Sequence, residues 1–425
     1  MKILWVVNIM LPEIAKHLGL PYSNREGWLT GIFGEFLKKK DEFSLCVAFP
    51  ADDKDLVGTK FDIDGIECRA FYEDLSHPEY YVKELEGVFK KMIKEVDPDV
   101  MHVSGTEFPH ALSAVRAFNN KNRTVISIQG ICRKIAEDYM AMLPSNVSCS
   151  ISFRDLVRKD WMRVQRRKFY LRAVSETEAL RLSGNVIGRT SFDREAVTGI
   201  NEEIRYFCVN ETMRPEFYEG SWDVDKASKH TIFTGQGDYP IKGLHFLIKA
   251  CGLLVKKYPD LTLRIAGNSI IESGTFKQRL KLPSYGKYLR KLISENGLEG
   301  HVVTTGPLKA DEMKNEYLSS SVFVLPSYIE NSPNTLAEAM LLGVPVVTSD
   351  AGGIKDMISE EEGFIFERGN YEQMAGLIKK VWESEDNDPL IIRNLVKKCR
   401  DRAFSQHNGE KNLEELFKVY EEIGR

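Results

Sequence analysis

The sequence lacks the features that mark several large classes of protein. No hydrophobic run approaches the ~20 apolar residues that a membrane-spanning helix needs. The seven cysteines are odd in number, scattered and never in a CxxC pair, which argues against a disulfide framework or a zinc ribbon. The net charge of −4 gives no global basic field for nucleic acid, and the eight histidines show no HxxxH spacing.

The start of the chain and its length point to a cytoplasmic protein of two or three domains. Met1 leads directly into Ile3–Val7, which predicts a strand and not a signal peptide. Scattered, unpaired cysteines fit a reducing compartment. At about 150 residues per domain, the 425 residues suffice for two or three domains, each with its own core.

Short β-rich runs alternate with amphipathic helical patterns along most of the chain. A helix is expected at 80–96 with a strand at 100–103, and the alternation resumes at strand 232–234. Strands separated by helices indicate parallel sheets covered on both faces, so we predict an α/β protein with two doubly wound domains. The predicted divisions are an N-terminal domain at 1–208, a C-terminal domain at 209–408, and a final amphipathic helix at 409–425.

The segment 322–357 carries the strongest functional signal. A strand ends at Leu325, a loop carries Glu330, and a helix is expected to begin with Ser332 as its N-cap. Glu338 lies about 200° around that helix from Leu336 and is expected to point away from the core. Helix N-termini favour phosphate and carboxylates suit sugar hydroxyls, so this edge of the sheet predicts a sugar-nucleotide site.

This segment resembles the signature of glycosyltransferase family 4, with Glu330 and Glu338 in the positions of its EX7E motif. The resemblance implies the GT-B fold, with two Rossmann-like domains facing across a cleft, and retaining transfer of a sugar from a nucleotide diphosphate donor. The likeness extends over nearly the whole chain. It includes the Gly27 loop, Pro98–Val103, Lys242-Gly243, Ala266-Gly267, Thr305-Gly306 and the C-terminal helix, which in the family crosses back onto the first domain.

The resemblance also implies roles for individual donor-side residues. Glu338 would hold the ribose hydroxyls and Glu330 the hydroxyls of the transferred sugar. Lys242 would neutralise the leaving diphosphate, as a lysine can without a metal ion. The further residues implied on the donor side are Gln236, Gly267, Leu308, Ser332, Asn334 and Thr335, with Leu308 packing on the base and amides near Asn334 and Thr335 helping Lys242.

Two positions depart from the family pattern. Gln236 stands where members commonly have arginine, and Gln129 stands where many have histidine. Both glutamines can hydrogen-bond a donor but carry no charge. Segments Ser127–Gly130, Gly105–His110 and Gly188–Asp193 resemble a bacterial branch of the family, so we interpret the glutamines as substitutions in an active site and count Gln129 as a catalytic residue.

The acceptor is expected to bind the first domain, near Gly27, Thr106 and Glu107. The segment 154–172 adds eight basic residues among apolar ones. It is either a solvated helix face or a contact with anionic lipid or a diphosphate-linked acceptor, which would make the protein peripheral at the inner face of the cell membrane.

No metal or other cofactor is expected beyond the nucleotide sugar, which acts as co-substrate. Asp62-Ile63-Asp64 matches a metal-binding DxD pattern but runs into Gly65 and is more typical of a hairpin turn. Gly235 and Gly237 lack the third glycine of a dinucleotide fingerprint.

The sequence therefore predicts a retaining, metal-independent glycosyltransferase that acts on a saccharide or lipid-linked acceptor in surface polysaccharide synthesis. Two alternatives stay open at this point. One is a non-catalytic sugar-nucleotide-binding subunit, which the two glutamines allow. The other is a GT-B epimerase, which would interconvert sugar nucleotides without an acceptor.

Overall fold

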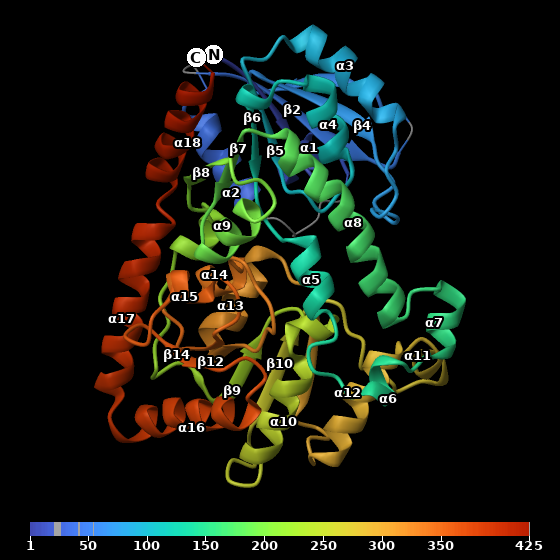
Figure 1. Ribbon diagram of the computed structural model, residues 1–425. Helices are drawn as coiled ribbons and strands as arrows, with labels where there is room; N and C mark the ends of the chain where they lie inside the picture. Colours follow the sequence, from blue (N-terminus) through green and yellow to red (C-terminus); the bar gives the residue numbers. More distant parts are fainter. Residues whose placement is uncertain (21–26, 41–42, 54, 425) are drawn as a thin grey trace. The chain divides into compact units, whose positions relative to one another are not determined.

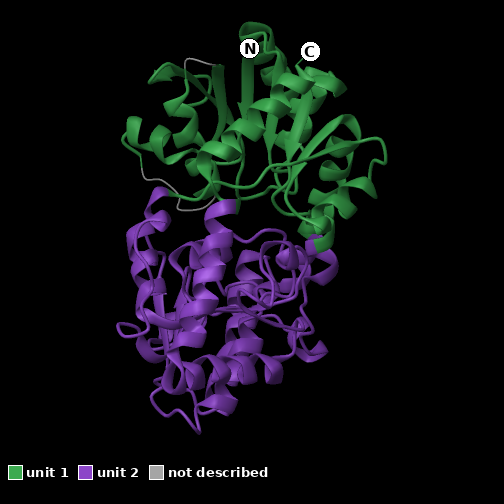
Figure 2. Ribbon diagram, turned by 90° about the vertical axis from the view of Figure 1, so that its left-hand side faces the viewer, with its two compact units in different colours: residues 1–134, 168–214, 406–425 green, residues 135–167, 215–405 purple. Residues whose placement is uncertain are grey.

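The computed structural model describes residues 1–20, 27–40, 43–53 and 55–424. These residues form two compact units (Figure 2). Unit 1 consists of Met1–Lys134, Lys168–Arg214 and Gln406–Arg425, and unit 2 consists of Ile135–Arg167 and Pro215–Ser405. Each unit is built around one sheet flanked by helices (Figure 1), so the predicted fold class of two Rossmann-like α/β domains is confirmed.

The sheet of unit 1 has eight strands in the order β3-β4-β2-β1-β5-β6-β7-β8. All neighbouring strands are parallel except β3 and β4, which form an antiparallel hairpin. The strands are β1 (Lys2–Val6), β2 (Ser44–Ala51), β3 (Lys60–Ile63), β4 (Ile66–Tyr72), β5 (Val100–Ser104), β6 (Thr124–Ser127), β7 (Asn185–Gly188) and β8 (Arg205–Cys208).

The helices of unit 1 are the connections that a parallel sheet requires. Helix α3 ends where Asp97 takes a left-handed conformation directly before Pro98, which cannot continue a helix. The helices are α1 (Pro12–His17), α2 (Gly27–Lys38), α3 (Glu84–Val96), α4 (His110–Phe118), η1 (Lys121–Arg123), α9 (Ser191–Thr198) and α18 (Gly409–Ile423), with the first residues of α5 (Cys132–Asp138) and most of α8 (Met162–Leu182).

Unit 2 contains a parallel six-stranded sheet in the order β11-β10-β9-β12-β13-β14. Its central strand β12 is buried along its whole length, as expected for a strand covered on both faces. The strands are β9 (Ser228–Thr234), β10 (Thr262–Ala266), β11 (Val302–Gly306), β12 (Ser320–Leu325), β13 (Val346–Ser349) and β14 (Phe364–Phe366).

The helices of unit 2 join these strands and extend past them. Gly343, with φ +70°, ends α14 in the left-handed conformation that glycine adopts most readily. The helices are α6 (Ser145–Ser148), α7 (Phe153–Arg158), η2 (Pro215–Tyr218), η3 (Pro240–Lys242), α10 (Leu244–Leu254), α11 (Phe276–Leu280), α12 (Ser284–Glu295), α13 (Ala310–Ser319), α14 (Asn334–Leu342), α15 (Ile354–Met357), α16 (Tyr371–Asn387) and α17 (Pro389–Gln406).

The final helix α18 packs within unit 1. Its buried side chains are Asn412, Leu413, Leu416, Phe417, Val419, Tyr420 and Ile423. The Phe417 ring meets Phe36 of α2 edge-on at 5.1 Å, and the Trp5 indole N–H donates to the Tyr420 hydroxyl at 2.7 Å. Unit 1 thus supplies the surface that the amphipathic pattern requires.

The units differ from the predicted domains 1–208 and 209–408 in two respects. Residues 209–214 and 406–408 belong to unit 1, which shifts both boundaries of the second domain by a few residues. Residues 135–167 were expected in the first domain but belong to unit 2, where their contacts lie. The His245 ring donates to the carbonyl of Ala141 at 3.0 Å, and Arg368 pairs with Asp138 at 3.0 Å. These contacts join residues more than 100 positions apart, which no local sequence pattern indicates.

Candidate functional site

In unit 2, the sheet changes direction between β9 and β12, since β10 and β11 extend it on one side and β13 and β14 on the other. Ligands of open α/β sheets bind outside the carboxyl ends of strands at such a point. The loops after these two strands contact each other there. The Tyr328 amide donates to the Ile241 carbonyl at 2.7 Å, and a β-carbon at Gly243 would overlap the Pro326 carbonyl oxygen.

This contact brings two predicted catalytic residues together. The Lys242 ammonium donates to the Glu330 carboxylate at 2.6 Å, and the Ser327 hydroxyl donates to the same carboxylate oxygen at 2.7 Å. The side chains of Lys242 and Glu330 are 27% and 10% exposed. The pair is therefore accessible to a ligand from one side and only partly hydrated.

The loop after β13 holds the backbone of Glu330 from the other side. The Gly353 amide donates to the Glu330 carbonyl at 3.1 Å. Gly352, with φ +54°, lies so close that a β-carbon there would overlap the same carbonyl oxygen. The glycine pair therefore permits this close approach of two backbone segments.

Helix α14 carries Glu338 and begins at Asn334. Pro333, not Ser332, occupies the N-cap position, so the predicted Ser332 cap is wrong. No side chain caps this end of the helix among the described residues, and the buried Asn334 amide oxygen has no hydrogen-bond partner among them. The first turn thus presents polar groups that a bound anion or hydroxyl could engage.

Glu338 is only 4% exposed, which differs from the expectation that it points away from the core. Every residue of α14 from Leu336 to Leu342 is buried, so this helix has no solvated face. The Tyr317 hydroxyl lies 3.3 Å from the Glu338 carboxylate and 2.9 Å from the Thr335 carbonyl. Tyr317 therefore fixes the Glu338 side chain at the start of α14.

The other donor-side residues lie in loops after neighbouring strands. A β-carbon at Gly235 would lie 3.3 Å from Thr335, and one at Gly267 would lie 3.6 Å from the Cα of Gln236. Gln236 is exposed and Leu308 is half-buried after β11. The carboxyl edge of this one sheet therefore carries all nine of the residues predicted for the donor: Gln236, Lys242, Gly267, Leu308, Glu330, Ser332, Asn334, Thr335 and Glu338.

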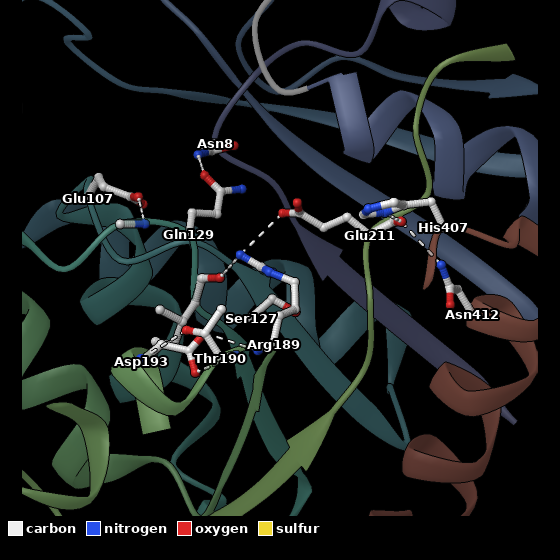
Figure 3. Close-up of polar contacts among 12 residues, drawn as sticks. Asn8, Glu107, Ser127, Gln129, Arg189, Thr190, Asp193, Glu211, His407 and Asn412 are labelled. Carbon is white, nitrogen blue, oxygen red and sulfur yellow. Dashed lines mark hydrogen bonds and ion pairs between the residues drawn. The ribbon is translucent and has the colours of Figure 1, made fainter. Parts of the chain in front are cut away.

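In unit 1, the loops after β1, β5 and β6 meet through polar contacts (Figure 3). The Asn8 side-chain amide donates to Gln129 at 2.9 Å. The Glu107 carboxylate accepts the amide of Gly130 at 2.6 Å and that of Thr106 at 3.0 Å. Gln129, Thr106 and Glu107 are therefore neighbours at the carboxyl edge of this sheet.

Glu176 of α8 belongs to this cluster, although no local sequence pattern indicates it. Its carboxylate accepts the Thr106 hydroxyl at 2.8 Å and the amides of Cys132 and Arg133 at 3.0 and 3.4 Å. Burial raises the pKa of Glu176 to about 7, against the lowering effect of these hydrogen bonds. Glu176 thus joins the loop after β5 to the beginning of α5.

Gly27 is the first residue of α2, and residues 21–26 before it lie outside the described part of the chain. A β-carbon at Gly27 would lie 2.9 Å from the Arg214 side chain. Nearby, Arg189 pairs with Glu211 at 3.2 Å, with both side chains 5% exposed (Figure 3). A pocket in unit 1 is lined by this pair together with aromatic and polar side chains that include Trp28 and Ser127.

The DxD segment forms the predicted hairpin turn. Asp64 has φ +51°, and the Asp62 carboxylate accepts the Gly65 amide at 2.8 Å between β3 and β4. Within the described residues, no group of three or more His, Cys, Asp and Glu side chains is arranged to hold a metal ion.

Residues 216–403 match the family model of glycosyl transferases group 1, which covers the donor-side edge just described. Over these residues the chain is similar to this family. The relationship predicted from the 322–357 segment is thereby confirmed.

Two related proteins are named as glycosyltransferases. An uncharacterized glycosyltransferase of Haemophilus influenzae is 32% identical over 193 residues, which cover 45% of this chain and 48% of that protein. The amylovoran biosynthesis glycosyltransferase AmsK of Erwinia amylovora is 26% identical over 184 residues, 41% of each chain. The chain spans less than half the length of these relatives.

Solved structures resemble the chain over nearly its full length. Sucrose-phosphate synthase from Thermosynechococcus elongatus has a TM-score of 0.71 at 14% identity, covering 99% of this chain and 98% of that one. HepE of Anabaena, solved with UDP and glucose, has a TM-score of 0.65 at 17% identity and 98% coverage of each chain. At these identities the likeness establishes the GT-B fold alone. Within the described residues, no helix combines the length and apolar character needed to cross a membrane.

Proposed function

We propose that this chain is a retaining glycosyltransferase that moves a sugar from a nucleotide diphosphate donor to a saccharide or lipid-linked acceptor. The observation that carries the proposal is the Lys242–Glu330 pair at the carboxyl edge of the unit 2 sheet, next to the uncapped beginning of α14. A cation and free backbone N–H groups suit a diphosphate, and carboxylates suit sugar hydroxyls.

Each donor-side group then has a distinct task. The Lys242 ammonium stabilises the negative charge that develops on the leaving diphosphate, together with N–H groups near Asn334 and Thr335. Glu330 orients the transferred sugar through its hydroxyls. Glu338, fixed by Tyr317, accepts hydrogen bonds from the ribose. Gln236, Gly267, Leu308 and Ser332 complete the donor site.

The proposed reaction uses no metal ion and no covalent intermediate. No side chain in the site is an evident nucleophile, so we favour displacement on the front face, with the leaving phosphate close to the incoming hydroxyl. Lys242 supplies the positive charge that a metal would otherwise bring. The epimerase alternative gains no specific support from the structure.

The acceptor is proposed to bind unit 1 near Thr106, Glu107 and Gly27, the first residue of α2. Gln129, which lies beside Thr106 and Glu107, is proposed as a catalytic residue. The neighbouring pocket offers the Trp28 ring and polar groups, a combination that suits a saccharide. AmsK is named for amylovoran biosynthesis and a Bacillus subtilis relative for teichuronic acid biosynthesis, so we propose a surface polysaccharide pathway. All seven cysteines are free thiols, which favours the cytoplasm.

A thermal-shift panel of nucleotide sugars tests the proposal. A true donor at 100 times its dissociation constant should stabilise the protein by about 2.7 kcal/mol. Turnover of that donor by the purified chain should then follow. Binding without hydrolysis or transfer would favour the non-catalytic subunit, and no shift with any nucleotide sugar would refute the proposal.

A further inference from the structure

The short helix α7 in unit 2 has its polar side inside and its apolar side outside. Asp155 is 1% exposed, and it forms a reciprocal capping box with Ser152. By contrast, Phe153, Leu156 and Val157 are 61%, 58% and 67% exposed. Half of a six-residue helix is thus large apolar side chains in contact with solvent. Scattered single apolar residues on a surface are ordinary, but a cluster of this kind marks an interaction surface.

A second helix with exposed apolar side chains, α11, ends four residues before Ser284, which contacts α7. Asp155 also accepts the backbone amide of Ser284 at 2.9 Å, which anchors α7 to the beginning of α12. Helix α11 lies directly before α12 in the chain, and Figure 1 shows it next to α7. Its Phe276 is 75% exposed and Leu280 is also exposed. We call these residues, with Ile151, the α7–α11 surface: Ile151, Phe153, Leu156, Val157, Phe276 and Leu280.

Basic side chains surround this surface. The exposed ones are Arg158, Lys159, Arg163, Arg167, Lys277, Arg279 and Lys281. The acidic groups in these segments are already engaged, since Asp155 is buried, Asp160 pairs with Arg154 at 2.6 Å, and Glu272 accepts a hydrogen bond from Gln278. Arg166, by contrast, donates to the Ala136 carbonyl and is half-buried, so it does not belong to the charged rim.

We propose that the α7–α11 surface docks on an anionic lipid membrane. Its apolar side chains enter the boundary between headgroups and acyl chains, and its basic rim pairs with the lipid phosphates. The charge decides between partners: a surface with this excess of basic residues repels a second copy of itself, while it complements an anionic bilayer. The proposal goes beyond the donor reaction and does not depend on it.

Vesicle sedimentation with the full chain tests the proposal. The chain should sediment with vesicles of equal parts phosphatidylglycerol and phosphatidylcholine, more at low than at physiological salt, and should stay in solution with pure phosphatidylcholine. The triple variant Phe153→Ser, Leu156→Ser, Val157→Ser and the double variant Arg158→Glu, Lys159→Glu should each lose at least tenfold in vesicle affinity.

Matched variants control for general effects of polarity and charge. Leu390→Ser with Ile391→Ser removes apolar side chains of 66% and 51% exposure from α17. Lys90→Glu with Lys91→Glu reverses two adjacent exposed charges on α3. Both controls should bind vesicles like the parent. A variant is counted as folded if its thermal unfolding temperature equals that of the parent. If the triple serine variant fails this check, the vesicle binding of the double charge variant tests the proposal instead.

Three outcomes would overturn the proposal. The parent chain does not sediment with phosphatidylglycerol vesicles at either salt concentration. The control variants lose as much affinity as the test variants. In the third outcome, light scattering shows that the parent is a dimer and the triple serine variant a monomer, while both bind vesicles equally. The surface would then join two copies of the chain.

Discussion

Removing the Glu330 carboxylate should strengthen the binding of a free nucleoside diphosphate while it slows sugar transfer. The Lys242 ammonium is engaged by Glu330 at 2.6 Å. A diphosphate must compete with that carboxylate for the same cation. The two proposed roles therefore oppose each other: Glu330 aids the sugar and hinders the diphosphate alone.

The size of the effect follows from the exposure of the pair. Exposed ion pairs contribute about 0.2–1 kcal/mol, and hydrogen bonds to charged groups about 1.5–3 kcal/mol. With side chains 27% and 10% exposed, Lys242 and Glu330 lie between these cases. A gain of about 1 kcal/mol in diphosphate binding is expected, which is about fivefold in the dissociation constant.

Isothermal titration calorimetry with UDP, or with the diphosphate of whichever donor is found, measures this directly. Glu330→Gln keeps the side-chain shape and loses the charge, so it should give most of the gain. Ser327→Ala removes only the neighbouring hydroxyl, which donates to Glu330 at 2.7 Å, and should change little. If Glu330→Gln instead weakens the binding of the diphosphate as much as Lys242→Ala does, the competition argument is refuted.

The remaining predictions concern Glu338, Lys242 and Glu176. Glu338→Ala should weaken the binding of the nucleoside diphosphate by about 1.5–3 kcal/mol and abolish the preference over its 2′-deoxy analogue. If the variant keeps that preference, Glu338 does not bind the ribose. Lys242→Ala should lower turnover at least tenfold. The parent should stay active in EDTA, and a loss of activity in EDTA that manganese reverses would argue for a metal-dependent reaction. The folded pKa of Glu176, about 7, lies above its unfolded value of 4.5, so its stabilising contribution is full below pH 4.5 and lost as the pH rises through 7. Urea unfolding at pH 5 and pH 8 measures the change in the free energy of unfolding between the two pH values. This change should be larger in the parent than in Glu176→Gln by on the order of 3 kcal/mol, and equal changes would contradict the raised pKa.

The sequence predicted those parts of the molecule that depend on local patterns. Short β-rich runs alternating with helical patterns indicated both sheets. The donor-side edge could be found because most of its residues, from Glu330 to Gly353, lie in one short segment. Lys242 is 88 positions from Glu330, and only the resemblance to a family placed the two in one site.

What the sequence missed depends on contacts between distant segments. Glu176 lies 70 positions from Thr106 in a charged helical stretch, where a surface glutamate is the ordinary expectation. The grouping of 135–167 with unit 2 rests on contacts such as Asp155 with Ser284. The sequence left the segment 154–172 open between a solvated helix face and a contact with anionic lipid or a diphosphate-linked acceptor. The structure shows that Leu156 and Val157 of α7 are exposed, while Met162 at the beginning of α8 is buried, a division that depends on the anchoring of Asp155 to distant residues.

The stereochemistry of the first product tests the central claim most directly. Proton NMR of the reaction, recorded with the donor that the thermal-shift panel identifies, shows the anomeric configuration of the transferred sugar before it equilibrates. The account predicts that an α-linked donor gives an α-linked product, with the rate greatly reduced in Lys242→Ala. A β-linked product, or turnover that does not depend on Lys242, would contradict it.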